Sequence, residues 1–345
     1  MVTTEESILF RGVGSPINSD MSQQEALEAT GLNWETCLKE FEYDFDGERL
    51  SSLQANTLAA IRSDNGHLLT VTGTNWQPYQ NSQLMSDFYT FCDRTGLIPD
   101  WGGFICRKHH SKSHLAPNMA FVSAKIPESM GGVFHLSPDE VINSRLVFFN
   151  HHTYGYGAGG YLLTCRQICS NGMTITVKEA RNLISHIRSQ VGSHEKIMEC
   201  LSMVRCQFTK YSQDLELLAD TLLTPEEALA ILIKDFGKPG IPLSDQPKIV
   251  KTCLELFLGH FDEQMNEQGV NLGSSTLAAF RTAYGLLQSV TAYKNHLSGA
   301  VAGGGRVLSM LSGSTAETTT KIHNTLVKVA RSPKTVTLSV PVREL

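Results

Sequence analysis

The chain has 345 residues, of which 41% are hydrophobic and 18% charged, and its formal net charge is −5. This composition is that of a folded protein with a buried core, and the length allows one large or two ordinary domains. The start "MVTTEESILFRGVG" has neither a basic leader nor an apolar core, and no stretch reaches the about 20 apolar residues of a membrane span. The sequence therefore predicts a cytoplasmic protein without membrane contact.

The charge is unevenly distributed along the chain. Residues 1–100 hold 5 Lys and Arg against 15 Asp and Glu, whereas residues 101–178 hold 7 against 3. Residues 179–280 are acidic again, with 9 against 14, and residues 281–345 hold 8 against 2. Segregated charge permits a local basic surface on an acidic protein, although ordinary surface variation explains the pattern equally well.

The first 100 residues predict a helix, a hairpin and a second helix. Ser22 and Glu25 have the spacing of a capping box, and Gly31 suits the end of the helix that they would begin. Two β-favouring runs around the turn "DNG" predict a hairpin over residues 57–73. Apolar residues at helical spacing predict a helix over residues 81–96, which we expect to pack on the apolar face of that hairpin.

Two further hairpins are predicted between residues 100 and 170. The first has arms at residues 103–108 and 118–126, and the second at residues 144–150 and 160–168. The polar connector "KHHSKSHLAP" joins the first pair, and a loop rich in glycine and tyrosine joins the second. Together with the earlier hairpin they predict an antiparallel β-sheet of roughly six strands with packed helices, an α+β fold.

The remainder of the sequence predicts mainly helices. Apolar residues from Ile197 to Leu222 alternate four and three apart, as on a long helix that packs against another helix of this chain or of a second subunit. Further helices are expected over residues 224–237 and 276–297, followed by a glycine- and serine-rich stretch. The predicted organisation is a sheet domain, a helical region, and a flexible connection with a C-terminal arm, over residues 1–178, 179–298 and 299–345.

The sequence favours a role without catalysis, and neither a metal nor a cofactor is expected. The eight cysteines form no CxxC pair, and we expect most of them to be reduced core thiols. No phosphate-binding GxxxxGK[ST], hydrolase GxSxG or zinc-binding HExxH motif occurs. A hydrolase that uses His151 or His152 remains an alternative, because sequence cannot test the geometry of a triad.

The connector between the two arms of the predicted 103–126 hairpin carries the strongest indication of a chemical function. Arg107, Lys108 and Lys112 lie with three histidines in a stretch without acidic residues, and such cations can neutralise phosphates. A solvated loop is an equally good reading of this cluster. Tyrosines of the second loop offer stacking faces for bases, although a structural hairpin explains its glycines at least as well. The predicted nucleic-acid-binding residues are Arg107, Lys108, Lys112, Lys125, Arg145, Arg166, Tyr154 and Tyr156.

Several patches in order, including "SDNGHLLTVTGTNWQPYQN", "NHHTYG", "LLTCRQICSNGM" and "AFRTAYGLLQSVTAYKNHL", resemble the phage/plasmid-like protein family, a domain of unknown function. The resemblance spans residues 8–298 and implies a mobile-element setting, with the host cytoplasm as the location. The residues that match the motifs of the family are Trp76, Tyr79, Gln80, Asn81, Asn150, His152, Cys169 and Asn171.

These observations predict an oligomeric protein that binds single-stranded DNA or RNA without ATP and assists strand annealing or protection. An outline similarity to phage single-strand annealing proteins supports this expectation by analogy alone. The alternative is a phage-encoded assembly or host-interaction protein whose basic zones meet acidic proteins instead of phosphates.

Overall fold

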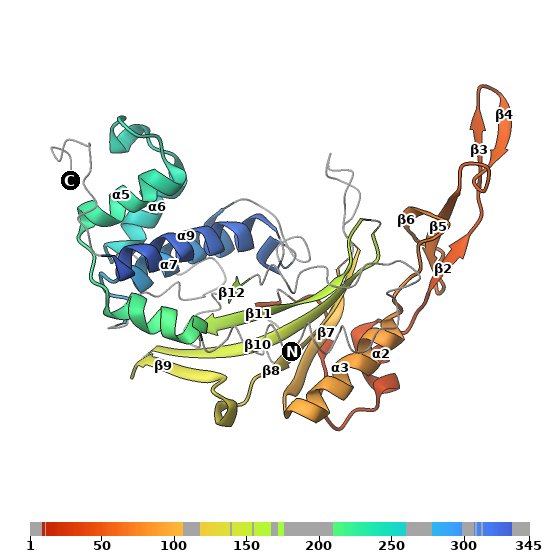
Figure 1. Cartoon of the computed structure of the whole chain (residues 1–345), viewed down its shortest axis with the longest axis horizontal. Helices are drawn as coiled ribbons and strands as arrows, with labels where there is room; N and C mark the ends of the chain where they lie inside the picture. Colours follow the sequence, from red (N-terminus) through yellow and green to blue (C-terminus); the bar gives the residue numbers. More distant parts are fainter. Residues whose placement is uncertain are drawn as a thin grey trace.

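The computed structural model describes residues 9–10, 12–105, 118–138, 140–153, 155–166, 172–175, 210–259, 278–298, 307, 309–311 and 313–332. It has an α+β fold, as the sequence predicts, with antiparallel sheets in the N-terminal half and most helices in the C-terminal half (Figure 1). Within the described residues, no helix combines the length and the apolar character needed to span a bilayer.

A large antiparallel sheet forms the centre of the molecule. Its strand order is β1-β7-β8-β10-β11-β12, and β9 pairs with β10. The two hairpins predicted after residue 100 are confirmed, because β7 pairs with β8 and β10 with β11. The strands of this sheet are β1 Ser15–Pro16, β7 Ile98–Ile105, β8 Met119–Lys125, β9 Val133–Ser137, β10 Glu140–His151, β11 Ala158–Arg166 and β12 Gly172–Ile175.

Helices α2, Gln23–Thr30, and α3, Asn81–Thr95, belong to the core on one face of the large sheet. The prediction that α3 packs on the 57–73 hairpin is wrong, because α3 lies against β7, β8 and β10 (Figure 1). Its apolar side chains face those of the large sheet, which offers a far broader apolar surface than the hairpin. The contact set includes Leu84, Met85 and Phe88 with Ala120, Val122, Leu146 and Phe148.

The helical layer lies at one end of the large sheet (Figure 1). Its elements are residues 210–220, α5 Pro225–Phe236, α6 Lys248–Phe257, α7 Ala283–Ala292 with a π-helical turn Tyr293–Leu297, and α9 Ser314–Arg331. Short 3₁₀ turns occur at Glu128–Met130 and Leu243–Asp245. The layer is joined to the sheet by Ile142 in its core and by the Tyr284 hydroxyl, which donates to Glu140 Oε1 at 2.7 Å.

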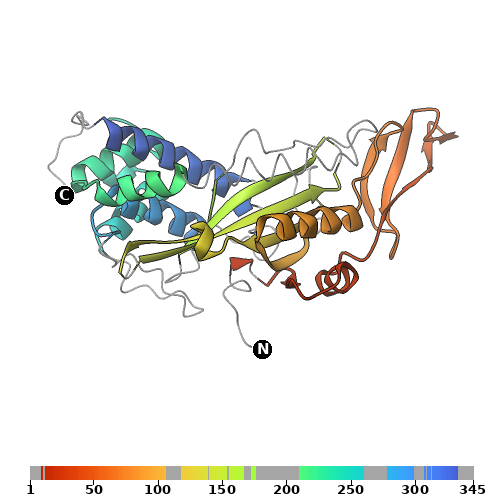
Figure 2. The same cartoon turned by 60° about the horizontal axis from the view of Figure 1, so that its bottom comes forward.

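A second, smaller group of strands extends away from the other end of the large sheet (Figures 1 and 2). Strands β2, β5 and β6 pair in that order, and β3 and β4 form a ribbon at the far tip. We call residues 36–73 the finger. Its strands are β2 Thr36–Lys39, β3 Glu42–Phe45, β4 Glu48–Ser51, β5 Thr57–Arg62 and β6 Leu68–Gly73. The predicted 57–73 hairpin is therefore confirmed as β5 and β6.

Local capping signals in the sequence are realised in the structure. Ser22 and Glu25 form the capping box of α2, which ends at Gly31 with φ of 67°. Thr224 and Glu227 form the corresponding box of α5. These side chains satisfy backbone N–H groups that have no partner within the first helical turn, so their positions fix where the helices begin.

Three expectations about the C-terminal half have different outcomes. Tyr211, Leu215 and Leu218 of the predicted seam are buried in the helical layer of the same chain, while residues 197–209 lie outside the described residues. The stretch read as a flexible connection contains α9, because Ala316, Ile322 and similar residues form a buried stripe that its many threonines obscured. Residues 333–345 and the predicted boundary at 178 lie outside the described residues.

Candidate functional site

A cluster of buried polar side chains joins the finger to the large sheet. His152, which follows β10, is fully buried, and its Nδ1 lies 3.0 Å from the Thr36 hydroxyl. Its Nε2 lies 2.9 Å from Asn81 Oδ1. The amide oxygen can only accept, so Nε2 carries a proton in this pairing, while Nδ1 faces the Thr36 hydroxyl. His152 thus bridges β2 and α3.

The neighbouring motif residues reinforce the same junction. The Gln80 side chain accepts from the Thr36 N–H at 2.8 Å and donates to the Thr36 carbonyl at 3.1 Å. Asn81 Nδ2 donates to the Trp34 carbonyl at 3.2 Å, and Asn150 Nδ2 donates to the Tyr79 carbonyl at 2.6 Å. Because these bonds satisfy backbone groups at the base of the finger, Gln80, Asn81 and Asn150 have a positioning role in this structure.

An aromatic stack completes the base of the finger, and no motif in the sequence predicted it. The Arg62 guanidinium lies 4.4 Å from the ring centroid of Trp34 and 5.3 Å from that of Phe104. Asp64 accepts from the same guanidinium at 2.9 and 2.6 Å, and this hydrogen bonding lowers the pKa of its carboxyl. Arg62, the last residue of β5, thereby connects the finger to Phe104 of the large sheet by a cation–π contact. Its ion pair with Asp64 fixes the orientation of the guanidinium.

Two further motif residues are buried beside this junction. The Tyr79 hydroxyl donates to Asp87 Oδ2 at 2.5 Å, and burial raises the pKa of Tyr79 well above its ordinary value. Trp76 is 6% exposed. Both side chains therefore belong to the packed interior, whereas Cys169 and Asn171 lie outside the described residues.

The two connectors predicted to bind nucleic acid leave the large sheet at the same end. Met119 of β8 pairs with Ile105 of β7 on one side and with His151 of β10 on the other. Residues 106–117 join β7 to β8, and residues 152–157 join β10 to β11, so the two connectors follow the strands that flank β8. Asn118 Nδ2 donates to the Leu69 carbonyl at 2.9 Å, which ties this sheet end to β6 of the finger.

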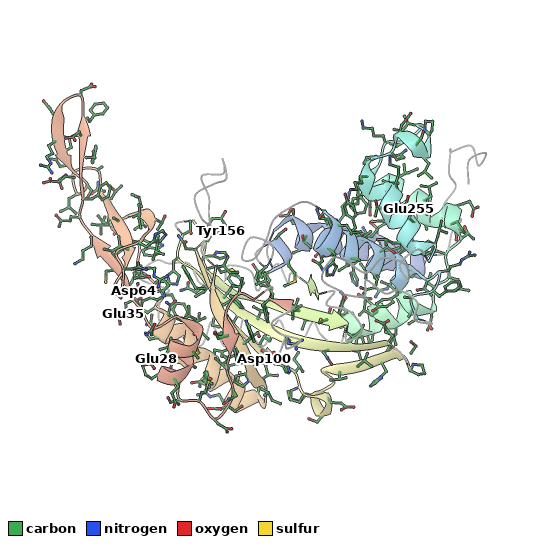
Figure 3. All side chains as sticks on the ribbon, turned by 180° about the vertical axis from the view of Figure 1, so that it is seen from behind. Glu28, Glu35, Asp64, Asp100, Tyr156 and Glu255 are labelled. Atoms are coloured by element: carbon green, nitrogen blue, oxygen red, sulfur yellow. The ribbon has the colours of Figure 1, made fainter. Side chains whose placement is uncertain are left out.

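Tyr156 is the residue predicted to bind nucleic acid that the structure describes in these connectors, and its side chain is partly exposed. Its ring lies 5.1 Å from that of His151, and Tyr156 lies at the end of the large sheet nearest to the finger (Figure 3). His151 itself is buried, with Phe149 on its other side at 5.2 Å. The positions of Arg107, Lys108, Lys112 and Tyr154 lie outside the described residues.

The other predicted phosphate ligands do not lie at this end. Lys125 ends β8 and pairs with Arg145, six residues along the strand from Met119, which is roughly 20 Å at the usual rise of a strand. Arg166 ends β11 opposite Ile142. Lys125 and Arg166 are therefore separated by the length of the strands from the sheet end where the connectors begin.

The prediction that Arg145 holds a phosphate is wrong. Its side chain is fully buried, and its Nε donates to Asp100 Oδ2 at 2.8 Å. The Ser123 hydroxyl donates to the other oxygen of Asp100. Burial raises the pKa of Asp100, while Arg145 and Ser123 oppose that rise. Arg145 thus serves as an internal counter-ion, which sequence could not reveal because strand alternation does not tell which face is covered.

Cysteines and possible metal ligands are distributed through the described residues as follows. They contain no group of three or more His, Cys, Asp and Glu side chains placed to hold a metal ion. Cys92, Cys165 and Cys253 are buried free thiols, and burial raises the pKa of Cys92 and Cys253. A buried thiol with a raised pKa is a poor nucleophile, because little of it is present as thiolate.

The structure thus defines an α+β protein in which the side chains of Gln80, Asn81, Asn150 and His152 connect a projecting finger to a central sheet. The family model described as a domain of unknown function, DUF932, matches residues 68–324. The chain belongs to this family. A search of curated proteins and a search of solved structures found no match.

Proposed function

We propose that this protein binds single-stranded nucleic acid through residues 106–117 and 152–157, at the end of the large sheet beside the finger. The observation that supports the proposal is the strand register, in which Met119 pairs with both Ile105 and His151. That register brings the chain ends of a cation-rich connector and a tyrosine-containing loop to neighbouring strands. The proposed contacts are phosphates at Arg107, Lys108 and Lys112, and bases at Tyr154 and Tyr156.

Physical chemistry favours a single strand over a duplex at such a surface. Cations that neutralise phosphates release counterions, and aromatic rings stack on bases that a single strand leaves accessible. The binding is expected to need no ATP, since the sequence has no nucleotide-binding motif. Strand annealing or protection in a phage or other mobile element, in the cytoplasm of the host, is the setting that we propose for this activity.

Fluorescence anisotropy with single- and double-stranded DNA and RNA, at several salt concentrations, tests the proposal. The full chain is compared with the variant Lys108→Gln/Lys112→Gln, whose salt dependence on single strands should fall by about 1.4 logarithmic units per decade of salt for two lost contacts. The matched control is Lys234→Gln/Lys248→Gln, which neutralises two exposed lysines of the helical layer. Absence of binding even at low salt would overturn the proposal.

The second candidate is an assembly or host-interaction protein that does not bind nucleic acid. The observation that favours it is the exposure of Tyr43 and Phe45, two aromatic side chains on the finger. The same variants separate the candidates. An oligomer that forms in both the wild type and Lys108→Gln/Lys112→Gln, while neither protein binds nucleic acid, supports the second candidate over the first.

A further inference from the structure

Exposed large apolar side chains gather in two places among the described residues. Five of the eight lie on the finger, namely Tyr43, Phe45, Leu53, Leu68 and Val71. Two more, Leu222 and Phe280, lie in the helical layer, and the remaining one is Ile98 at the start of β7. Single exposed apolar residues are ordinary, but grouped ones are typical of surfaces that contact another protein.

One face of the ribbon of β3 and β4 carries apolar side chains and is largely exposed, with the Phe41 ring 6.3 Å from that of Tyr43. Tyr43 pairs with Leu50, and Phe45 pairs with Glu48, so these four side chains share one face. Phe45 is 63% exposed and Tyr43 is 37% exposed. An isolated two-stranded ribbon is only marginally stable in water, and its aromatic face would gain from being covered.

The same ribbon is strongly acidic. Asp44, Asp46 and Glu48 are exposed, as is Glu42, which forms an ion pair with Arg49 at 2.7 Å. The surface that covers this ribbon should therefore combine an apolar contact with a cation. A lysine- or arginine-bearing apolar patch fits these requirements, whereas an acidic or purely polar surface does not.

A patch of this kind exists on the helical layer of the chain itself. Leu222 is 75% exposed, Phe280 is 57% exposed, and the Arg281 guanidinium lies 5.6 Å from the Phe280 ring. The two segments are held together by an isolated bridge, with the Leu223 N–H donating to the Arg281 carbonyl at 2.9 Å. We call Leu222, Phe280 and Arg281 the bridge patch.

The backbone of the bridge patch is itself unusual. Arg281 has φ of 52°, a conformation that costs energy for a residue with a side chain. This conformation is combined with an exposed guanidinium and with two exposed apolar neighbours. The strained backbone at Arg281 therefore coincides with a cation and apolar side chains that are exposed to solvent.

We propose that the β3–β4 ribbon of one copy docks on the bridge patch of a second copy of this chain. The ribbon and the helical layer lie at opposite ends of the molecule, as Asp64 at the base of the finger and Glu255 in α6 indicate (Figures 1 and 3). The two surfaces of one chain therefore cannot meet each other. A contact between different patches is heterologous, so it joins copies head to tail into a ring or an open chain.

Analytical ultracentrifugation of the full chain over a range of concentrations, without nucleic acid, tests this contact. The ribbon variant Phe45→Asp and the patch variant Phe280→Asp should each raise the dissociation constant by roughly 30-fold or more, as for a central interface aromatic. Ile98→Ser is the matched control, since Ile98 is 48% exposed but lies outside both surfaces. Circular dichroism checks that each variant folds, which is expected because the changed side chains are exposed.

Mixing the two variants gives the decisive result. Phe45→Asp keeps an intact bridge patch and Phe280→Asp keeps an intact ribbon, so an equimolar mixture should form a one-to-one complex and grow no further. A wild-type protein that stays monomeric at every concentration would overturn the proposal. So would a mixture that stays monomeric, because the intact ribbon of one variant and the intact bridge patch of the other would then have failed to associate. Since no nucleic acid is present, the outcome is independent of the function proposed above.

Discussion

At the scale of single residues, substitutions of Arg145 and Asp100 test whether Arg145 stabilises the fold or binds nucleic acid. Removing one partner of a buried ion pair leaves the other charge buried and uncompensated, which costs roughly 3–5 kcal/mol. Arg145→Met should therefore lower the free energy of unfolding by about that amount, as measured by urea denaturation. Its affinity for single-stranded nucleic acid, where the protein remains folded, should stay at the wild-type value.

The double variant Arg145→Met/Asp100→Leu is the control for this prediction. It removes both charges, so much of the lost stability should return, because neither partner is left buried alone. A single variant as stable as the wild type would contradict the burial of the pair. A weakened affinity in folded Arg145→Met would instead restore this residue to the binding surface.

At the scale of elements, the sequence predicted features that depend on nearby residues better than it predicted the packing of elements distant in the chain. The capping box predicted at Ser22 is confirmed, because a cap depends on residues three positions apart. The placement of α3 was wrong because the surface that receives it comes from β8 and β10, distant in sequence. The motif around His152 was visible as a resemblance, but its positioning role became evident from contacts with Thr36, 116 residues away.

The attachment of the finger depends on His152, and this gives a second prediction. His152→Ala leaves a cavity beside Trp34 and removes the partners of Thr36 and Asn81, a loss of roughly 2–4 kcal/mol. Amide hydrogen exchange should accelerate more in β5 and β6 of the finger than in β8 of the large sheet.

The matched control for the finger is His135→Ala, since His135 is an exposed histidine of β9. This variant should exchange at wild-type rates throughout the finger. Equal acceleration of exchange in β5 and β8 of His152→Ala would show that the histidine stabilises the whole fold and would contradict a specific role at the junction.

At the scale of the whole molecule, the finger lies at one end of the large sheet and the helical layer at the other (Figure 2). The connectors begin at the sheet end that is nearer to the finger. The α+β class was predictable because turn signals and apolar periodicity mark each element. The projection of the finger was not predictable. The acidic stretch with alternating aromatic residues at its tip, residues 42–51, is also compatible with a hairpin that other elements cover. The sequence likewise left the bridge patch unnoticed, since Leu222 and Phe280 were assigned to helical faces and Arg281 carries no motif.

The proposed head-to-tail contact and the proposed binding of single strands together predict a dependence on strand length. Copies joined head to tail present repeated connectors, so a long strand engages several of them and gains from effective concentration. Wild-type protein should bind an oligonucleotide of about 60 nucleotides much more tightly than one of about 15, beyond the statistical gain in sites. Phe45→Asp should bind the short strand normally and lose the additional gain on the long one, as measured by anisotropy. A variant that keeps the gain would separate assembly from binding, and one that loses affinity for the short strand would place the finger within the binding surface.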